Sequence, residues 1–237
     1  MQSLHIYAIV IILAHMHTPL LALVTEATMA TENTASRPEG FTTNWEYSPS
    51  VSSLFGTFMG VAVFGWLVSV FLSVIHFWAL PQIPEGAEVA GSLKVIMSDW
   101  GYVLGVPLAT LGALYYLATI ALAAWWFDTR HPLIIKILTP ITATGVIASA
   151  YFVWLQLVPI GEICPFCMIS AAATVVLFAL ELMILRASDA PSAKELWQDA
   201  GNLWQQSAMK WPMLLLSVGG LTLLVVWAAT FAPVPGT

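Results

Sequence analysis

Charged residues are scarce in this 237-residue chain: they make up 8% of it, whereas hydrophobic residues make up 59%. A soluble domain carries about 25% charged residues, because its surface must be covered by groups that water solvates. This chain has too few such groups to cover a globular surface. The composition therefore excludes an ordinary soluble fold and indicates that lipid is the solvent of most of the chain.

The sequence also lacks features that several function classes require. It has no basic run interleaved with aromatic residues, so we expect no nucleic acid partner. It has no internal repeats. Only two cysteines are present, and the five histidines lie in segments distant from them. A structural metal site takes about four ligands, so we also expect no metal.

What the chain does contain is a series of long apolar runs. A spanning helix needs about 20 mostly apolar residues. Five runs meet this length, at residues 53–80, 103–127, 133–160, 164–186 and 211–231. A sixth run at 4–24 has no basic residue at its start, which leaves an extra span, a signal sequence and an over-long start as open alternatives. The pattern predicts an all-α integral membrane protein.

Three connections between these runs differ in character. Residues 25–50 are polar and without periodicity, and we expect a flexible linker there. Residues 81–102 form the longest connection between good spans, and the stretch KVIMSDWGYVL favours a partly helical, interfacial segment. Residues 187–210 are amphipathic. The apolar side chains expected at the membrane surface there are Leu196, Trp197, Leu203 and Trp204.

The distribution of basic residues predicts the orientation. Only Lys94 lies in the 81–102 connection, and no basic residue lies at 160–163. Cytoplasmic connections carry the excess of lysine and arginine, so we expect Cys164 and the 81–102 connection on the outer, oxidising side. The five basic residues around the opposite connections are Arg130, Lys136, Arg186, Lys194 and Lys210.

Both cysteines lie in one short stretch, GEICPFCMIS at residues 161–170. If a helix starts here, Pro165 occupies its first turn, where a missing N–H costs nothing. Cys164 then caps the helix, and free backbone N–H groups with the helix dipole stabilise its thiolate. Cys167 follows about one turn later, within reach of a disulfide with Cys164. Burial of two structural cysteines, or half of a metal site, would be the alternatives.

A redox pair at a membrane surface needs an acceptor for two electrons. A lipid-soluble quinone, of the ubiquinone or menaquinone type, can diffuse to it within the apolar phase. Among the nearby ionisable groups, His76 could contact a quinone carbonyl. Glu162 could raise the pKa of Cys164 or relay protons, although a solvated loop carboxylate is the simpler interpretation. Glu181 lies near the cytoplasmic end of its span, and we expect it to extend to the membrane surface.

Three ordered motifs resemble the vitamin K epoxide reductase family, especially its bacterial members. GVPLATLGALYYLATIAL at 105–122 is similar to the second core helix of that family, and KVIMSDWGYVLG before it matches the family segment with a serine and an aromatic residue, here Ser98 and Trp100. YFVWLQLVPIGEICPFCMIS at 151–170 resembles the junction between the third and fourth core helices. The resemblance implies a four-helix bundle over residues 51–186, with 211–237 as a fifth helix and outer tail.

The resemblance also implies a site. Cys167 would form a transient adduct with a quinone and Cys164 would receive electrons, while Leu111 and Tyr115 would face the quinone ring and Ser98 and Pro165 would support the pair. The departure from the family is in residues 81–102, where members carry a second cysteine pair and this chain has none; the expected position reads Gly91-Ser92. Bacterial members often continue into a thioredoxin-like domain, and we expect none in this chain.

The sequence therefore favours a membrane thiol–quinone oxidoreductase of this type. It would sit in a bacterial inner membrane, plasma or photosynthetic, with the cysteine pair facing the periplasm or lumen. A periplasmic thioredoxin-like protein or another thiol partner would supply electrons. The alternative is an inactive accessory or structural subunit of a larger membrane complex.

Overall fold

The computed structural model describes residues 45–78, 80, 83–84, 88–189, 192–207 and 219. The chain divides into two units, residues 1–37 and 38–237, and all described residues belong to the second. The apolar segment 4–24, most of the linker expected at 25–50 and the span expected at 211–231, except Gly219, lie outside the described residues.

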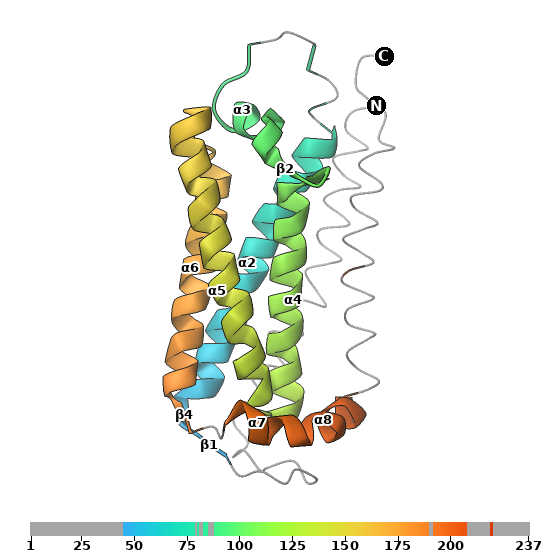
Figure 1. Ribbon diagram of the computed structural model, residues 1–237, viewed down its shortest axis with the longest axis vertical. Coiled ribbons are helices and arrows are strands. Elements are labelled where there is room, and N and C mark those ends of the chain that lie inside the picture. The colour runs from blue at the N-terminus through green and yellow to red at the C-terminus, as the bar shows by residue number, and fades with distance from the viewer. Residues whose placement is uncertain are drawn as a thin grey trace, which may run out of the picture. The chain divides into compact units, whose positions relative to one another are not determined.

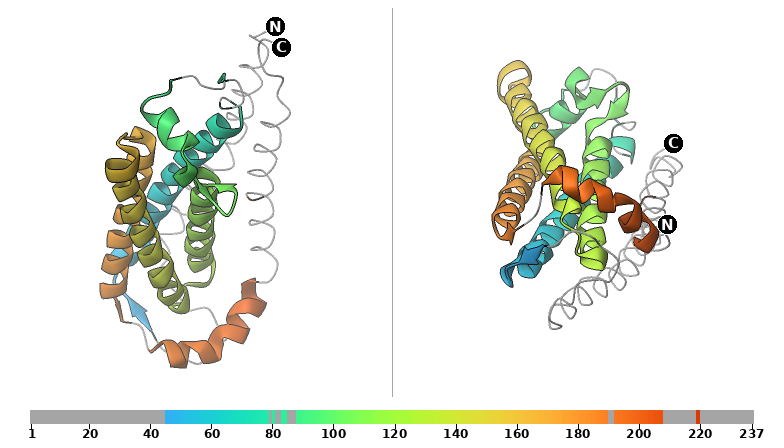
Figure 2. Two further views of the ribbon diagram at one scale, coloured as in Figure 1. Left: turned by 45° about the horizontal axis from the view of Figure 1, so that its top comes forward. Right: turned by 60° about the horizontal axis from the view of Figure 1, so that its bottom comes forward.

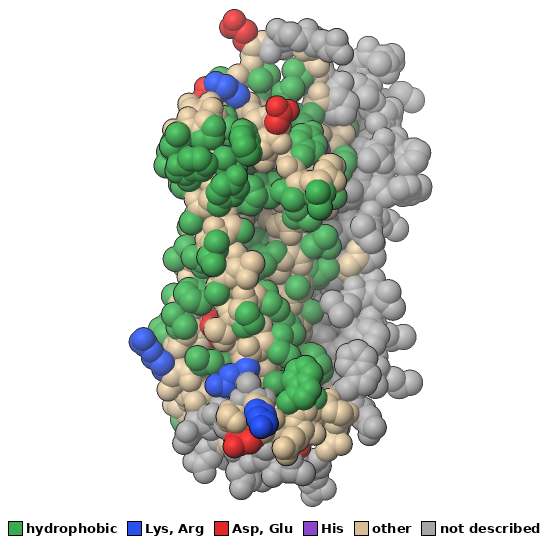
Figure 3. Space-filling model, viewed as in Figure 1, with side chains coloured by type: hydrophobic (Ala, Val, Ile, Leu, Met, Phe, Trp, Pro, Cys, Tyr) green, Lys and Arg blue, Asp and Glu red, His purple; other side chains and the backbone are tan. Residues whose placement is uncertain are grey.

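Within the described residues, four helices are long and apolar enough to cross a membrane. They are α2 (Ser50–Trp78), α4 (Leu108–Thr129), α5 (Leu133–Leu155) and α6 (Pro165–Arg186), and a π-helical turn at Gln156–Ile160 extends α5. In the bundle, α2 packs against α4 and α6, and α5 packs against α6 and α4 (Figure 1). Apolar side chains cover the middle of the face in Figure 3, as lipid contact requires. The predicted all-α membrane fold is confirmed.

Two glycines allow the helices to approach closely. A Cβ atom on Gly65 of α2 would collide with the ring of Tyr116 on α4, and one on Gly145 of α5 would collide with the ring and hydroxyl of Tyr115. Small residues at helix crossings let backbones pack in lipid, where no hydrophobic force drives the helices together. Each tyrosine therefore fills the space that a missing side chain leaves.

The connection after α2 carries a short helix, α3 (Ser92–Met97), and a 3-10 turn, Asp99–Gly101. A hairpin follows, in which β2 (Tyr102–Val103) pairs antiparallel with β3 (Val106–Pro107). Its turn places Leu104 and Gly105 at positive φ, 52° and 80°, as two-residue hairpin turns require. The predicted start of the second span at residue 103 is wrong for this reason: the hairpin uses residues 102–107, and α4 begins at Leu108.

At the opposite end of the bundle, β1 (Glu46–Tyr47) pairs with β4 (Ser188–Asp189). The amphipathic connection then forms α7 (Ala193–Leu196), a 3-10 turn (Trp197–Asp199) and α8 (Ala200–Ser207), which run across the ends of α4 and α5 (Figure 2).

The apolar side chains of this connection do not all face the membrane surface. Leu196 and Leu203 are buried, whereas 68% of Trp197 is exposed. Asp199 is also buried and lies 3.9 Å from His131, between α4 and α5. The prediction that this apolar face lies on the membrane is therefore wrong for both leucines, which pack inward. The side chain of Trp204 is outside what the structure describes.

Candidate functional site

Cys164 caps helix α6. Its backbone is extended, with φ −97° and ψ 109°, and Pro165 follows in the first turn. The backbone N–H of Cys167 donates to the Cys164 sulfur at 3.3 Å. A capping side chain accepts from a first-turn N–H in this way, and a thiolate is a stronger acceptor than a thiol. The capping geometry expected from the sequence is confirmed.

The loop before this cap is fixed by Gln156, which sequence reasoning missed. The buried Gln156 side-chain carbonyl accepts the backbone N–H of Cys164 at 2.8 Å, and the backbone carbonyl of Gln156 accepts the N–H of Glu162 at 3.1 Å. Gly161, at φ 68°, closes the turn between them. A polar residue eight positions before Cys164, at the end of an apolar run, was the signal that could have identified this contact.

Both cysteines are free thiols, and Cys164 is fully buried. A hydrogen bond from the Cys167 side chain lowers the pKa of Cys164 most, and burial opposes it. The backbone N–H of Cys167, the Ser92 hydroxyl and the backbone of Phe166 add smaller stabilising contacts. Together they lower the pKa of Cys164 from an ordinary value near 9 to about 6. The cap therefore favours a thiolate at neutral pH.

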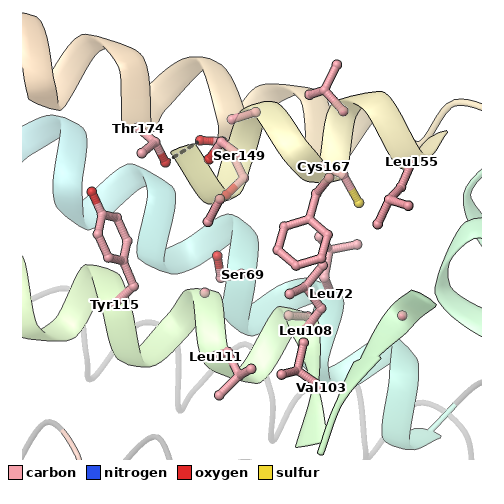
Figure 4. A pocket seen from close by; sticks show the side chains of 18 of the residues that line it. Ser69, Leu72, Val103, Leu108, Leu111, Tyr115, Ser149, Leu155, Cys167 and Thr174 are labelled. Atoms are coloured by element: carbon pink, nitrogen blue, oxygen red, sulfur yellow. Dashed lines mark hydrogen bonds between the residues drawn. The ribbon is translucent and has the colours of Figure 1, made fainter. Parts of the chain in front are cut away.

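A cavity of about 710 Å³ opens beside Cys167, between the four spanning helices and α3. This volume lies within the range of small-molecule pockets, about 300–1,000 Å³. Cys167 and Tyr115 lie well apart along its wall (Figure 4). The helix α4 lines it with Leu108, Leu111, Gly112 and Tyr115, one face at helical spacing. Of the residues predicted for the site, those that line this cavity are Cys167, Leu111, Tyr115, His76 and Ser98.

The polar groups of the lining differ in whether they already have partners. The Tyr116 hydroxyl donates to the Ser170 carbonyl at 2.6 Å and contacts the Thr174 hydroxyl at 3.0 Å. The Ser98 hydroxyl donates to the carbonyl of Val95 at 2.7 Å, which fixes the end of α3. In the part of the chain that the structure describes, the buried Tyr115 hydroxyl has no hydrogen-bond partner. It is the group that a bound ligand's oxygen could satisfy.

Two predicted site residues, Cys164 and Pro165, do not line the cavity. Pro165 is outside the lining and acts through the helix start. His76 is buried in the lining, and its ring packs edge-on against Tyr102 at a centroid distance of 5.0 Å. Contact with a ligand at this ring is compatible with that packing, because the ring lies on the cavity wall.

The remaining ionisable groups lie elsewhere. Glu181 is 1% exposed and accepts a hydrogen bond from Thr139, so the expectation that it extends to the membrane surface is wrong. Glu162 contacts α3 through Gly91 and Lys94 rather than standing free in solvent. Among the described residues, no three metal-ligating side chains come together.

The comparisons with known proteins agree with this geometry. No curated protein matches the chain. The sequence profile of the vitamin K epoxide reductase family matches residues 56–182, which run from the first turns of α2 to the last turns of α6 and so contain the cavity and both cysteines. Because the match covers more than half of the 237 residues, the chain belongs to the vitamin K epoxide reductase family.

Proposed function

We infer that the protein is a membrane thiol–quinone oxidoreductase that works through Cys164 and Cys167. One observation carries this proposal: the Cys167 side chain lines a largely apolar cavity of about 710 Å³, while its neighbour Cys164 is held as a thiolate-favouring cap. Family membership supports a membrane oxidoreductase at the coarser level. The cavity adds a space between apolar helices that suits a flat, lipid-soluble ring.

The lining fits a quinone in three respects. Its walls are mainly aliphatic and aromatic, as an apolar ring and chain require. The unpartnered Tyr115 hydroxyl can donate a hydrogen bond to a carbonyl oxygen. Leu111 lies one turn before Tyr115 on the same face of α4, so both can contact one ligand.

The proposed reaction balances two electrons and two protons. A bound quinone supplies the oxidising power and leaves as a quinol. The two thiols of Cys164 and Cys167 lose two protons and two electrons and become a disulfide. An external dithiol then reduces this disulfide through a mixed disulfide at Cys164 and is itself oxidised. The low pKa of Cys164 makes it a good leaving group when the second thiol of the partner breaks the mixed disulfide.

The charge distribution supports the proposed orientation. Arg130 follows α4, Lys136 lies in the first turns of α5, Arg186 ends α6 and Lys194 lies in α7. All four are at the end of the bundle away from the cysteines, whereas Lys94 lies in α3 at the cysteine end. Since cytoplasmic ends carry the excess of basic residues, the cysteine end faces the periplasm or lumen in a bacterial inner membrane, plasma or photosynthetic. A thioredoxin-like protein is the thiol partner that this orientation admits.

A second candidate is an accessory subunit of a larger membrane complex without thiol chemistry. The observation that favours it is the absence of any cysteine in residues 81–102, together with full burial of Cys164. Trapping separates the two functions. Purified reduced protein is mixed with ubiquinone or menaquinone, quenched with a maleimide in denaturant so that the buried Cys164 is also accessible, and analysed by peptide mass spectrometry. Quinone-dependent loss of labelling at both cysteines supports the enzyme, whereas unchanged labelling supports the accessory subunit.

A matched pair of variants tests whether the cavity holds the quinone. In Gly145→Ala the new Cβ must displace the Tyr115 ring, whereas in Gly56→Ala the new Cβ meets no atom within 4 Å. Both changes are glycine to alanine in a spanning helix. We expect Gly145→Ala to raise the quinone concentration needed for half-maximal oxidation about tenfold, about the cost of an overpacked contact. Equal values for the two variants would place the quinone elsewhere.

A further inference from the structure

The sulfur that must meet the external dithiol is inaccessible in this structure. Cys164 has no exposed surface. It packs in a small apolar cluster with Leu72 of α2 and with Val95 and Ile96 of α3. An attacking thiolate must approach a sulfur along the line of the bond that breaks, so it cannot react with a sulfur covered in this way. The short helix α3 has to move before exchange at Cys164 can occur.

The Glu162 carboxylate joins α3 to the cysteine loop, beside the contact of the Ser92 hydroxyl with the Cys164 sulfur. Glu162, two residues before Cys164, accepts the backbone N–H of Gly91 on one oxygen at 3.2 Å. Its other oxygen lies 3.7 Å from the Lys94 ammonium. Gly91 precedes α3 and Lys94 lies in its first turn, so both contacts hold the start of the helix. The side chain therefore bridges two segments that lie 71 residues apart in the chain.

The two contacts of Glu162 can hold α3 over Cys164 and can also break when α3 moves. About half of the Lys94 side chain is exposed, 47%, and 31% of the Glu162 side chain is exposed, so water screens the ion pair. The hydrogen bond from Gly91 to a charged acceptor is the firmer of the two contacts. α3 contains no cysteine, so it has no disulfide with the loop that would have to break before it moves.

We propose that Glu162 is a positioning residue that latches α3 over Cys164, and that release of this latch admits the reducing thiol partner. Only the second part of this proposal, the admission of a reducing thiol partner, rests on the proposed function. When α3 moves, a thiolate of the partner dithiol attacks the Cys164 sulfur of the Cys164–Cys167 disulfide, and Cys167 leaves as a thiolate. The second partner thiol then breaks the mixed disulfide, and the partner departs as a disulfide.

The test is the labelling rate of Cys164 by a membrane-impermeant maleimide in reduced protein. It is run in a Cys167→Ser background, so that one thiol reacts. We expect Glu162→Gln to raise the rate about tenfold, because it loses the charge-assisted contacts. Lys94→Met removes only the half-exposed ion pair with Glu162, and we expect the labelling rate to rise about threefold. The control, Glu88→Gln, removes an exposed carboxylate of the same connection and should leave the rate unchanged.

The sign of the Lys94→Met effect separates a latch from a change in the local field. Loss of a positive charge near Cys164 disfavours its thiolate and would slow labelling, whereas an opened latch speeds it. Glu162→Asp gives a second check, because it keeps the charge but shortens the reach to Gly91 and Lys94. Helical circular dichroism verifies that each variant is folded. Unchanged rates in Glu162→Gln and Lys94→Met, or a slower rate in Lys94→Met, would overturn the proposal.

The measurement uses neither quinone nor partner protein, so its outcome is independent of whether the proposed reaction occurs. If that reaction does occur, turnover gives a second readout. Latch variants should lower the apparent KM for a small dithiol such as dithiothreitol and leave the KM for quinone unchanged. Equal shifts in both values would indicate a general disturbance of the bundle instead of a latch.

Discussion

Replacement of Cys167 with alanine tests the electrostatic asymmetry of the cysteine pair. The hydrogen bond from the Cys167 side chain is the largest contribution that lowers the pKa of Cys164. In the alanine variant this donor is lost, but the backbone N–H at position 167 still points at the Cys164 sulfur. The pKa of Cys164 should therefore rise from about 6 toward its ordinary value near 9 without reaching it.

The expected size follows from the acid–base equilibrium. Because its pKa is lowered from the ordinary value near 9, Cys164 has a larger thiolate fraction at pH 7 than an ordinary cysteine. Each unit of pKa corresponds to about 1.4 kcal/mol of preferential stabilisation of the thiolate. We expect a rise of about one to two units, because one of several donors is removed.

The assay is the rate of iodoacetamide reaction at Cys164 as a function of pH, since only the thiolate reacts. Deprotonation speeds the reaction, so the rate increases with pH and is half-maximal at the pKa. Cys167→Ser keeps a hydroxyl donor and is the matched control, with a midpoint between those of the alanine variant and the native protein. A midpoint that is the same in the native protein and Cys167→Ala would refute the assignment of Cys167 as the principal donor.

Three further changes have distinct expected outcomes. In a Cys167→Ser background, Ser92→Cys should form an oxidant-induced disulfide with Cys164, because the Ser92 hydroxyl already contacts that sulfur; intact-mass analysis after alkylation detects it, and its absence would contradict the placement of α3. Gly65→Ala should lower the free energy of unfolding by about 1–3 kcal/mol, because its Cβ would collide with the Tyr116 ring; an unchanged melting temperature would show that the helices can shift. Leu104→Asn should stabilise the protein by about 1 kcal/mol, because Leu104 is fully exposed at φ 52° and asparagine tolerates that conformation; a lower melting temperature would mean that the leucine has a partner.

The features that the sequence predicts correctly are governed by local rules. A proline costs a helix least in its first turn, so the start of α6 at Pro165 and the cap at Cys164 can be predicted from adjacent residues. The apolar runs at 133–160 and 164–186 coincide with the helical segments Leu133–Ile160 and Pro165–Arg186, because length and hydropathy alone define a span. Leu111 and Tyr115 lie one helical turn apart and both line the cavity, whereas their predicted contact with a quinone ring stays a prediction.

The features that were missed depend on contacts between distant segments. Hydropathy could not separate the hairpin at 102–107 from α4, since both are apolar and only Leu104 and Gly105 reverse the chain. Amphipathicity could not say whether Leu196 faces lipid or the ends of α4 and α5, because both environments are apolar. The contact between Glu162 and Gly91 joins residues 71 positions apart, and neither residue predicts the other.

The spacing of the two cysteines explains how one helix turn can serve two different reactants. Cys164 is at the cap, buried beneath α3, whereas Cys167 is one turn further along α6, on the cavity wall. A disulfide between them would connect two environments: the small apolar cluster that α3 covers and the cavity between the spanning helices. In the proposed reaction, electrons enter at the first sulfur and leave from the second, so the dithiol and the quinone never need to occupy the same site. A chain with a single cysteine at either position would lose this separation. C164S should abolish turnover because the protein can no longer exchange with the dithiol. C167S should abolish turnover because no sulfur then contacts the quinone.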